Sequence, residues 1–277
     1  MTQLKLELVQ QEIKDGDIDY NVGRIVQAIE KCSSEVDIIV FSEVAMTGFL
    51  TPANVDQLAL SLDSEPVKKV AQALEKRGIA GIMGLTEREG DKLFNTAVFI
   101  KDGSVFCKYQ KTHLWLGDRG VVQAGDRFVA FDHKGVRIGL IICFDSEFPE
   151  TSRALAELEV DLIVICDGNM EPYGHLHQTS VKARAQENQV FVAMVNRIGV
   201  GEDKAVYHGN TSVVDPEGHT QFMAGSIECK TIISIDANHT ARARKDFFYS
   251  SEKRFKFPGE IVDHEKGWKE LIIPHST

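Results

Sequence analysis

The sequence predicts one layered α/β domain in which helices cover mixed β-sheets, and three observations support this prediction. Short apolar, β-branched runs bounded by turn residues recur along the chain, as is typical of strands. Amphipathic helical segments lie between several of these runs. Two hairpins interrupt the alternation, so parallel and antiparallel strand pairs are expected within the same sheets.

The strands are predicted where the apolar runs are short and lie between turn residues. In chain order, these runs are Leu4–Val9, Val36–Phe41, Ile79–Leu85, Ala97–Ile100, Val136–Ile142, Val160–Ile165, Val190–Val195, Thr211–Val214 and Thr231–Ile235. The hairpins are expected at Lys101-Asp102-Gly103, between Phe94–Ile100 and Ser104–Tyr109, and at Pro216-Glu217-Gly218 after Thr211 to Val214.

The helices are predicted from apolar residues that recur with helical spacing. Val22–Lys31 carries such a stripe, and so does Val67–Lys76, which Gly78 follows as a stop signal. Thr151–Leu158 and Ser180–Asn188 are shorter candidates. No linker or repeat divides the chain, so residues 1–277 are expected to form a single domain. Residues 237–277 lose the pattern and are predicted to be an extension that packs on the domain or on a partner subunit.

Composition excludes several classes of function. The net charge of −10 argues against a dedicated nucleic-acid-binding protein, which normally has a basic face. No apolar run is long enough for a membrane helix, and the N-terminus does not have the pattern of a signal peptide. The 5 cysteines form no CxxC pair or His/Cys cluster, so neither a metal nor a cofactor is expected. A reducing, cytoplasmic location fits these thiols best.

Cys143 is the thiol that the sequence places best for reactivity. It follows the predicted strand Val136–Ile142 and precedes a helix-like segment, and ligands bind at the carboxyl ends of strands in α/β sheets. A strand-to-helix turn exposes a nucleophile near backbone N–H groups, which lower the pKa of a thiol and stabilise an oxyanion. The alternative is a buried structural thiol, because free cysteines are often buried. Cys166 also ends a strand and is the rival candidate.

A thiol nucleophile needs a base and a group that stabilises the charge on the substrate. Glu43 follows the strand that ends at Phe41, and Lys111 follows the strand that ends at Tyr109. His113 could instead be the base of a Cys–His pair. Spacing alone does not select Glu43 over His113.

Three blocks of residues resemble the motifs of the nitrilase superfamily of carbon–nitrogen hydrolases, in the same order. The blocks are Phe41-Ser42-Glu43 with Thr47-Gly48-Phe49, Tyr109-Gln110-Lys111-Thr112-His113-Leu114, and Gly139-Leu140-Ile141-Ile142-Cys143-Phe144-Asp145 with Phe148-Pro149-Glu150. The resemblance extends from about Leu4 to Asp236 and includes Ala183-Arg184-Ala185, Glu187-Asn188 and Asn196-Arg197.

The resemblance implies a four-layer αββα sandwich and homodimers or larger assemblies. It also implies that Glu43 is the general base, Lys111 the oxyanion stabiliser and Cys143 the nucleophile, which makes His113 a structural residue. A further glutamate is common in the family seven residues before the glycine of a Pro-Gly-Asp-like turn. Counting back from Gly125 reaches Asp118, whose side chain is one methylene shorter, so its part in positioning a substrate is in doubt.

The predicted function is hydrolysis of a small primary carboxamide to a carboxylic acid and ammonia through a thioester. The branch of the family is amidase-like, because the segment after Cys143 lacks the arginine pair common in carbamoylases. Asp118, Phe144 and Asn169 are predicted to bind substrate, while Phe49, Trp115, Phe144 and Tyr173 are candidates for an apolar wall. Nitrile or N-carbamoyl hydrolysis are the alternatives among enzymes. A redox-sensing thiol protein with a Cys143–Cys166 pair and a non-catalytic binding module are the alternatives outside them.

Overall fold

Two large mixed sheets form the centre of the structure, a computed structural model that describes residues 3–202, 204–254 and 257–274. The first sheet has six strands in the order β14-β1-β2-β3-β4-β5. Their bounds are β14 Cys229–Asp236, β1 Gln3–Gln10, β2 Ile38–Val40, β3 Ala80–Glu89, β4 Lys92–Lys101 and β5 Ser104–Gln110. β1, β2 and β3 run parallel, whereas β14, β4 and β5 pair antiparallel with their neighbours.

The second sheet has eight strands in the order β13-β12-β9-β8-β7-β6-β16-β15. Their bounds are β13 Thr220–Met223, β12 Ser212–Val214, β9 Phe191–Val195, β8 Leu162–Cys166, β7 Val136–Ile142, β6 Arg127–His133, β16 Trp268–Ile272 and β15 Glu260–His264. β7, β8 and β9 are parallel, and the other pairs are antiparallel. β10 (Ile198–Val200) and β11 (Val206–His208) form a separate hairpin.

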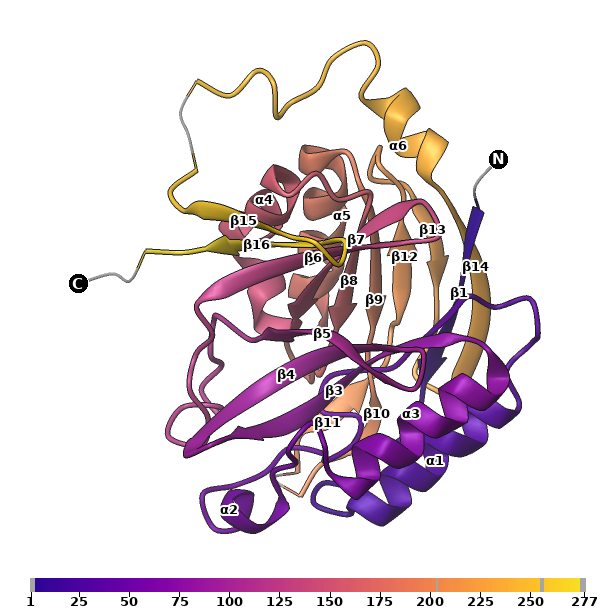
Figure 1. The fold of residues 1–277 in the computed structure, drawn as a ribbon, viewed down its shortest axis with the longest axis vertical. Helices are drawn as coiled ribbons and strands as arrows, with labels where there is room; N and C mark the ends of the chain where they lie inside the picture. The colour runs from indigo at the N-terminus through magenta and orange to yellow at the C-terminus, as the bar shows by residue number, and fades with distance from the viewer. Residues whose placement is uncertain (1–2, 203, 255–256, 275–277) are drawn as a thin grey trace.

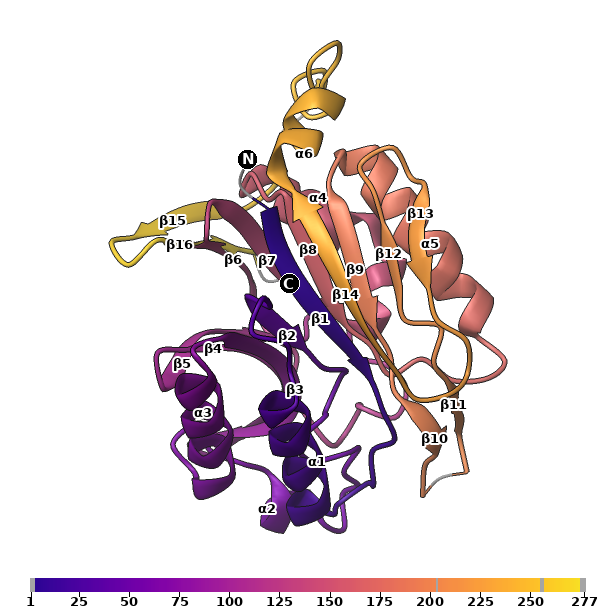
Figure 2. The same cartoon turned by 90° about the vertical axis from the view of Figure 1, so that its right-hand side faces the viewer.

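Helices cover the outer face of each sheet, and the inner faces pack on one another (Figures 1 and 2). α1 (Ile18–Glu30) and α3 (Glu65–Arg77) lie on the first sheet, while α4 (Pro149–Glu157) and α5 (Gly174–Asn188) lie on the second. The pleat of the strands separates the two faces. Ile38 and Val40 belong to the cluster between the sheets, whereas Ile39 belongs to the cluster under α1 and α3. The two mixed sheets with helices confirm the predicted fold class.

The predicted strands and helices are present, and the bounds of β7 and the end of α3 agree most closely with the prediction. β7 has the predicted bounds, and Gly78 ends α3 in the left-handed conformation with φ of 67°. The pattern missed β6, the β3–β4 hairpin, the β10–β11 hairpin and the short helix α2 (Val55–Leu58). No helix of the described residues is long and apolar enough to cross a membrane.

Residues 237–277, which lost the pattern in the sequence, contain α6 (Ala237–Ala243) and the β15–β16 hairpin in their described part. β16 pairs antiparallel with β6, so this segment continues the second sheet (Figure 1). The segment packs on this chain through β16. The description of the chain as one domain with an extension stays a prediction.

Candidate active site

Glu43, Lys111 and Cys143 come together at one end of the sandwich because three strands end there. Glu43 follows β2, Lys111 directly follows β5, and Cys143 directly follows β7. All three side chains are buried and line the same cavity, which has a volume of about 260 Å³. Cys143 has a φ of 45°, a conformation that non-glycine residues adopt at strained functional turns. The structure therefore groups the residues that the sequence proposed as base, cation and nucleophile.

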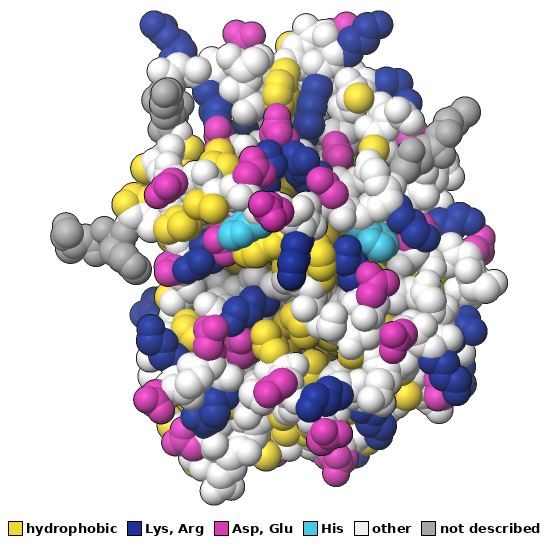
Figure 3. Space-filling view, viewed as in Figure 1, with side chains coloured by type: hydrophobic (Ala, Val, Ile, Leu, Met, Phe, Trp, Pro, Cys, Tyr) yellow, Lys and Arg dark blue, Asp and Glu magenta, His cyan; other side chains and the backbone are white. Residues whose placement is uncertain are grey.

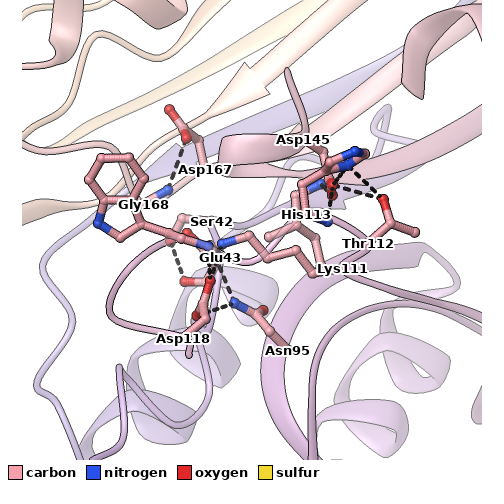
Figure 4. Close-up of polar contacts among 12 residues, drawn as sticks. Ser42, Glu43, Asn95, Lys111, Thr112, His113, Asp118, Asp145, Asp167 and Gly168 are labelled. Atoms are coloured by element: carbon pink, nitrogen blue, oxygen red, sulfur yellow. Dashed lines mark hydrogen bonds and ion pairs between the residues drawn. The ribbon is translucent and has the colours of Figure 1, made fainter. Parts of the chain in front are cut away.

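Lys111 lies between two carboxylates (Figure 4). Its Nζ is 2.8 Å from Oε1 of Glu43 and 2.7 Å from Oδ2 of Asp118. Asn95, on β4, donates a hydrogen bond of 2.7 Å to Oε1 of Glu43. The backbone N–H of Trp115 donates to Oδ2 of Asp118 at 3.0 Å. Asp118 therefore contacts the lysine even though its side chain is one methylene shorter than the glutamate common in the family.

The second carboxylate oxygen of Glu43 has no hydrogen-bond partner, although it is fully buried. Gly168, which follows β8, faces this oxygen so closely that a Cβ at this position would lie 2.3 Å from it. One oxygen of Glu43 is thus fixed by Lys111 and Asn95, while the other is a free acceptor in the site that contains Cys143. This is the arrangement expected of a general base before its substrate is present.

Burial controls the proton affinities of the three groups. Burial raises the pKa of Glu43, and the Lys111 ammonium partly offsets this effect. The expectation that the turn lowers the pKa of the Cys143 thiol is wrong: burial, followed by the charge of Glu43, raises this pKa well above its usual value. Burial alone would lower the pKa of Lys111, but Glu43 and Asp118 outweigh it and raise this pKa well above its usual value. The resting site therefore holds a protonated thiol and a lysine that stays charged.

His113, the alternative base, is directed toward Asp145 (Figure 4). Its backbone N–H donates to Oδ1 of Asp145 at 2.9 Å, and its Nδ1 lies 3.0 Å from the same oxygen. Thr112 and Tyr109 also donate to this buried carboxylate, at 3.0 Å and 2.8 Å. The hydrogen bonds of Asp145 thus connect the segment around Lys111 to the turn that contains Cys143. His113 contributes to this connection.

Cys166, the rival nucleophile, ends β8 as predicted but is fully buried, whereas Cys143 lines the cavity. Burial, followed by the charge of Glu43, raises the pKa of the Cys166 thiol far above its usual value. Both cysteines are free thiols. Cys166 therefore has the properties of a structural thiol.

The residues predicted to bind substrate fall into two groups. Asp118 lines the large cavity with Phe49 and Trp115. Phe144, Asn169 and Tyr173 line a second, small cavity of about 20 Å³ that also reaches Cys143. Trp115 contributes to both cavities and packs edge-on against Phe144, with ring centroids 5.0 Å apart.

The lining of the large cavity is mostly apolar, although Glu43, Lys111 and Asp118 are charged. Its apolar lining residues are Val44, Phe49, Leu50, Pro52, Trp115, Val121, Val122, Met170 and Tyr207. Asp15 and Glu202 also line it, and Asp15 is paired with the buried Arg197 at 2.7 Å. No arginine is among its described lining residues, so the structure offers no clamp for a substrate carboxylate there. The face of the molecule drawn in Figure 3 has basic and acidic side chains intermixed.

The sequence did not indicate Asn95 or His177 as residues of the site. Asn95 holds Glu43, while Asp167 and Gly168 follow β8 directly beside it. The sequence predicts that the segment from Cys166 to Tyr173, which follows a predicted strand and includes both residues, lines the mouth of the pocket, and Gly168 does line the cavity. Nothing in the sequence pointed to Asn95 or to His177 on α5, because their neighbours in space are distant in the chain.

Cys143, Asp167 and His177 bring potential metal-ligand atoms within 4.8 Å of one another. However, Nδ1 of His177 lies 3.0 Å from Asp167 and Nε2 lies 3.2 Å from Glu147, so both ring nitrogens are engaged with carboxylates. A metal ligand needs a free lone pair on one of these nitrogens. The group is thus better described as a hydrogen-bonded cluster, and the absence of a metal stays a prediction.

Comparisons with known proteins agree with this geometry. A family model described as carbon-nitrogen hydrolase matches residues 5–245. An (R)-stereoselective amidase of Pseudomonas sp is 40% identical over 270 residues, which cover 98% of each chain. The omega-amidase NIT2 of Homo sapiens is 29% identical over 268 residues, which cover 92% of this chain and 96% of the relative.

A solved structure from Xanthomonas campestris supports the same relationship. This protein, XC1258, is described as a CN-hydrolase superfamily protein with an arsenic adduct in the active site. It has a TM-score of 0.85 and 25% identity, covering 92% of this chain and 99% of that chain. The four-layer sandwich predicted from the motif blocks is confirmed by this likeness and by the two helix-covered sheets.

Proposed function

Because the chain belongs to the carbon–nitrogen hydrolase family, as the three motif blocks predicted, we propose that it hydrolyses small primary carboxamides to a carboxylic acid and ammonia. The observation that carries the proposal is the free, buried oxygen of Glu43 in the cavity that Cys143 lines. The apolar cavity without an arginine favours a neutral substrate of modest size. The likeness to an (R)-stereoselective amidase supports the choice of amides over nitriles and N-carbamoyl compounds.

In the proposed first half-reaction, the free oxygen of Glu43 accepts the thiol proton while Sγ of Cys143 attacks the carbonyl carbon. The tetrahedral oxyanion receives hydrogen bonds from the Lys111 ammonium and the backbone N–H of Phe144. Glu43 then returns the proton to the amide nitrogen, the C–N bond breaks and ammonia leaves. A positioned base contributes about 10²–10⁴-fold to such a reaction, and one oxyanion donor about 10²–10³-fold.

In the second half-reaction, a water molecule replaces ammonia beside Glu43. Glu43 removes one proton from the water, whose oxygen attacks the thioester carbon, and Lys111 again stabilises the oxyanion. The C–S bond breaks, the proton returns to sulfur and the carboxylic acid leaves. The thiol is regenerated, so one water is consumed for each amide bond. Asp118 and Asn95 keep Lys111 and Glu43 in place, and no cofactor takes part.

The test is an ammonia-release assay on a matched panel of primary amides, nitriles and N-carbamoyl amino acids, with both enantiomers of each chiral amide. We expect the wild type to release ammonia fastest from amides, while Cys143→Ala releases none above the uncatalysed rate with its fold retained. Faster turnover of nitriles or N-carbamoyl compounds would overturn the assignment of the substrate. Full activity of the Cys143→Ala variant would overturn the mechanism.

We also propose that the protein acts as a homodimer or larger homo-oligomer in the cytoplasm. The first point rests on the resemblance of the three motif blocks to a family whose members form homodimers or larger assemblies. Five free cysteines support the second, because thiols stay reduced in that compartment. Light scattering over a range of protein concentrations would test the assembly, and a monomer throughout would contradict it.

A further inference from the structure

Cys143 lines two cavities, and the smaller one contains charged groups that the proposed mechanism does not use. The larger cavity holds Glu43 and Lys111, whereas the smaller is lined by Glu147 and His177 together with Asn169. His177 lies on α5 with only 3% of its surface exposed. A buried ionisable side chain beside a reactive thiol needs an explanation, because burial of an unpaired charge is costly.

His177 is held at both ring nitrogens. Nδ1 lies 3.0 Å from Oδ1 of Asp167, and Nε2 lies 3.2 Å from Oε1 of Glu147. A neutral imidazole has one N–H and one lone pair, so it can donate to only one of two ionised carboxylates. The imidazolium donates to both. The geometry thus selects the charged form of His177.

This charge lies close to the thiol. The Cys143 sulfur, a ring nitrogen of His177 and a carboxylate oxygen of Asp167 are all within 4.8 Å of one another. Neither ring nitrogen has a lone pair left for the thiol proton, so His177 cannot replace Glu43 as the base. The other oxygen of Asp167 is buried without a partner. Without His177, Asp167 would place an uncompensated negative charge beside the sulfur.

We propose that His177, held by Asp167 and Glu147, is a positioning residue whose positive charge stabilises the thiolate of Cys143. The inference rests on the proposed function, in which Cys143 is the nucleophile. Lys111, in the large cavity, then stabilises the oxyanion, while His177, in the small cavity, offsets the negative charge of Asp167. The charge of His177 is useful because Glu43 and Asp167 both disfavour a negative sulfur.

The charged groups around His177 agree with this role. Burial alone would lower the pKa of His177, but Asp167 and then Glu147 outweigh it and raise the pKa to about 9. Asp167 faces the ring from the end of β8, whereas Glu147 and Cys143 face it from the turn after β7. Arg184, on the same helix, donates instead to the backbone carbonyls of Ser146 and Glu147. His177 therefore stays charged below about pH 9 and loses its charge above it.

The test is the rate at which N-ethylmaleimide, which is not a primary amide, alkylates Cys143 between pH 6 and 8.5, followed by mass spectrometry of the Cys143 peptide. His177→Gln removes the charge at every pH, and we expect alkylation about tenfold slower than in the wild type throughout, since one unit of thiol pKa changes the thiolate fraction tenfold. Glu147→Gln keeps the imidazole but removes a carboxylate that raises its pKa. We therefore expect this variant to match or exceed the wild type at pH 6 and to approach His177→Gln at pH 8.5.

His175→Gln is the matched control, because His175 is exposed on the same helix and should leave the alkylation rate unchanged. Circular dichroism would verify that each variant folds. A His177→Gln variant that alkylates at the wild-type rate would overturn the inference, and so would an equal loss in both variants at every pH, which indicates a merely structural role. The readout does not depend on turnover. Its failure would leave the proposed function standing, whereas Cys143 that resists alkylation in the wild type would count against both.

Discussion

Nζ of Lys111 lies 2.8 Å from Oε1 of Glu43, and the two side chains are only 1% and 0% exposed. This pair leaves one oxygen of Glu43 free while it fixes the other, so it orients the base as well as holding the cation. The charge balance depends on Asp118, which gives Lys111 a second carboxylate at 2.7 Å. Removal of Lys111 leaves both buried carboxylates without their cation.

Lys111→Met should therefore lower stability as well as activity. The variant leaves Glu43 and Asp118 buried without their cation, and breaking such a pair costs about 3–5 kcal/mol. Urea unfolding at pH 7.5 would measure this loss. Lys68→Met is the control, since Lys68 forms only an exposed pair with Glu65 and should change stability little. Equal effects of the two substitutions would contradict the role of the buried pair.

Activity should fall at acid pH. Glu43 acts as a base only when it is ionised, and burial raises its pKa above the ordinary value of about 4.3. The kcat/KM for a neutral amide should therefore decrease as pH falls through this raised pKa, while Lys111 stays charged because its own pKa is raised. A pH–rate profile between pH 4 and 9 would measure the acid limb. A rate that stays constant down to pH 4 would contradict the assignment of Glu43 as the base.

The same shift predicts how stability depends on pH. Because the folded state raises the pKa of Glu43, this group stabilises the fold below its unfolded value near 4.3 and loses that contribution as pH rises. Glu43→Gln keeps a neutral side chain at every pH. The free energy of unfolding of the variant relative to the wild type should thus improve from pH 4 to 8, as measured in urea. If the variant instead became less stable relative to the wild type from pH 4 to 8, Glu43 would be stabilised in the fold as an anion.

Substitutions at His113 and Asp145 separate the two candidate bases. His113→Ala removes one partner of Asp145 and should keep activity within about tenfold of the wild type, whereas loss of a general base costs about 10²–10⁴-fold. Asp145→Asn replaces an accepting oxygen with an amide group that donates, while Tyr109, Thr112 and Ile142 also donate at this position. One buried donor is then left without an acceptor, which should reduce the free energy of unfolding by about 1–3 kcal/mol. Steady-state kinetics and urea unfolding would measure both. Loss of activity by more than 100-fold in folded His113→Ala would restore His113 as the base.

Gly168→Ala should lower activity by on the order of 100-fold, because the added Cβ would lie 2.3 Å from Oε2 of Glu43 and displace the base. The kcat/KM for a primary amide would measure this effect. Gly23→Ala is a matched control in α1, where no atom lies within 4 Å of the added Cβ. That control should be fully active and about 0.5–1 kcal/mol more stable. Wild-type activity of Gly168→Ala would mean that Glu43 does not need its present position.

The sequence predicted the elements whose pattern is local. β7 is an apolar run apart from Arg137 and was predicted with its observed bounds, so the position of Cys143 at the end of a strand followed directly. β16 could not be predicted in this way, because Lys269 and Glu270 interrupt its apolar residues and it becomes a strand by pairing with β6. The C-terminal segment, read from the sequence as patternless, is thus partly sheet.

The site also contains residues that local sequence predicts and residues that it does not. Glu43, Lys111 and Cys143 each follow a predicted strand, but their choice over His113 came from the resemblance and not from spacing. The direction of His113 depends on Asp145, which lies 32 residues away in the chain. Asn95 and His177 join the site only through tertiary packing, since their partners Glu43 and Glu147 lie on other elements.

The most direct test of Cys143 as the nucleophile is to capture the thioester. Wild-type protein is mixed with a primary amide, quenched in acid within its first turnovers and digested for peptide mapping by mass spectrometry. The account predicts that the acyl mass appears on the peptide of Cys143, disappears when substrate is exhausted and is absent in Cys143→Ala. An acyl group on a different residue, or steady ammonia release by Cys143→Ala, would contradict the account.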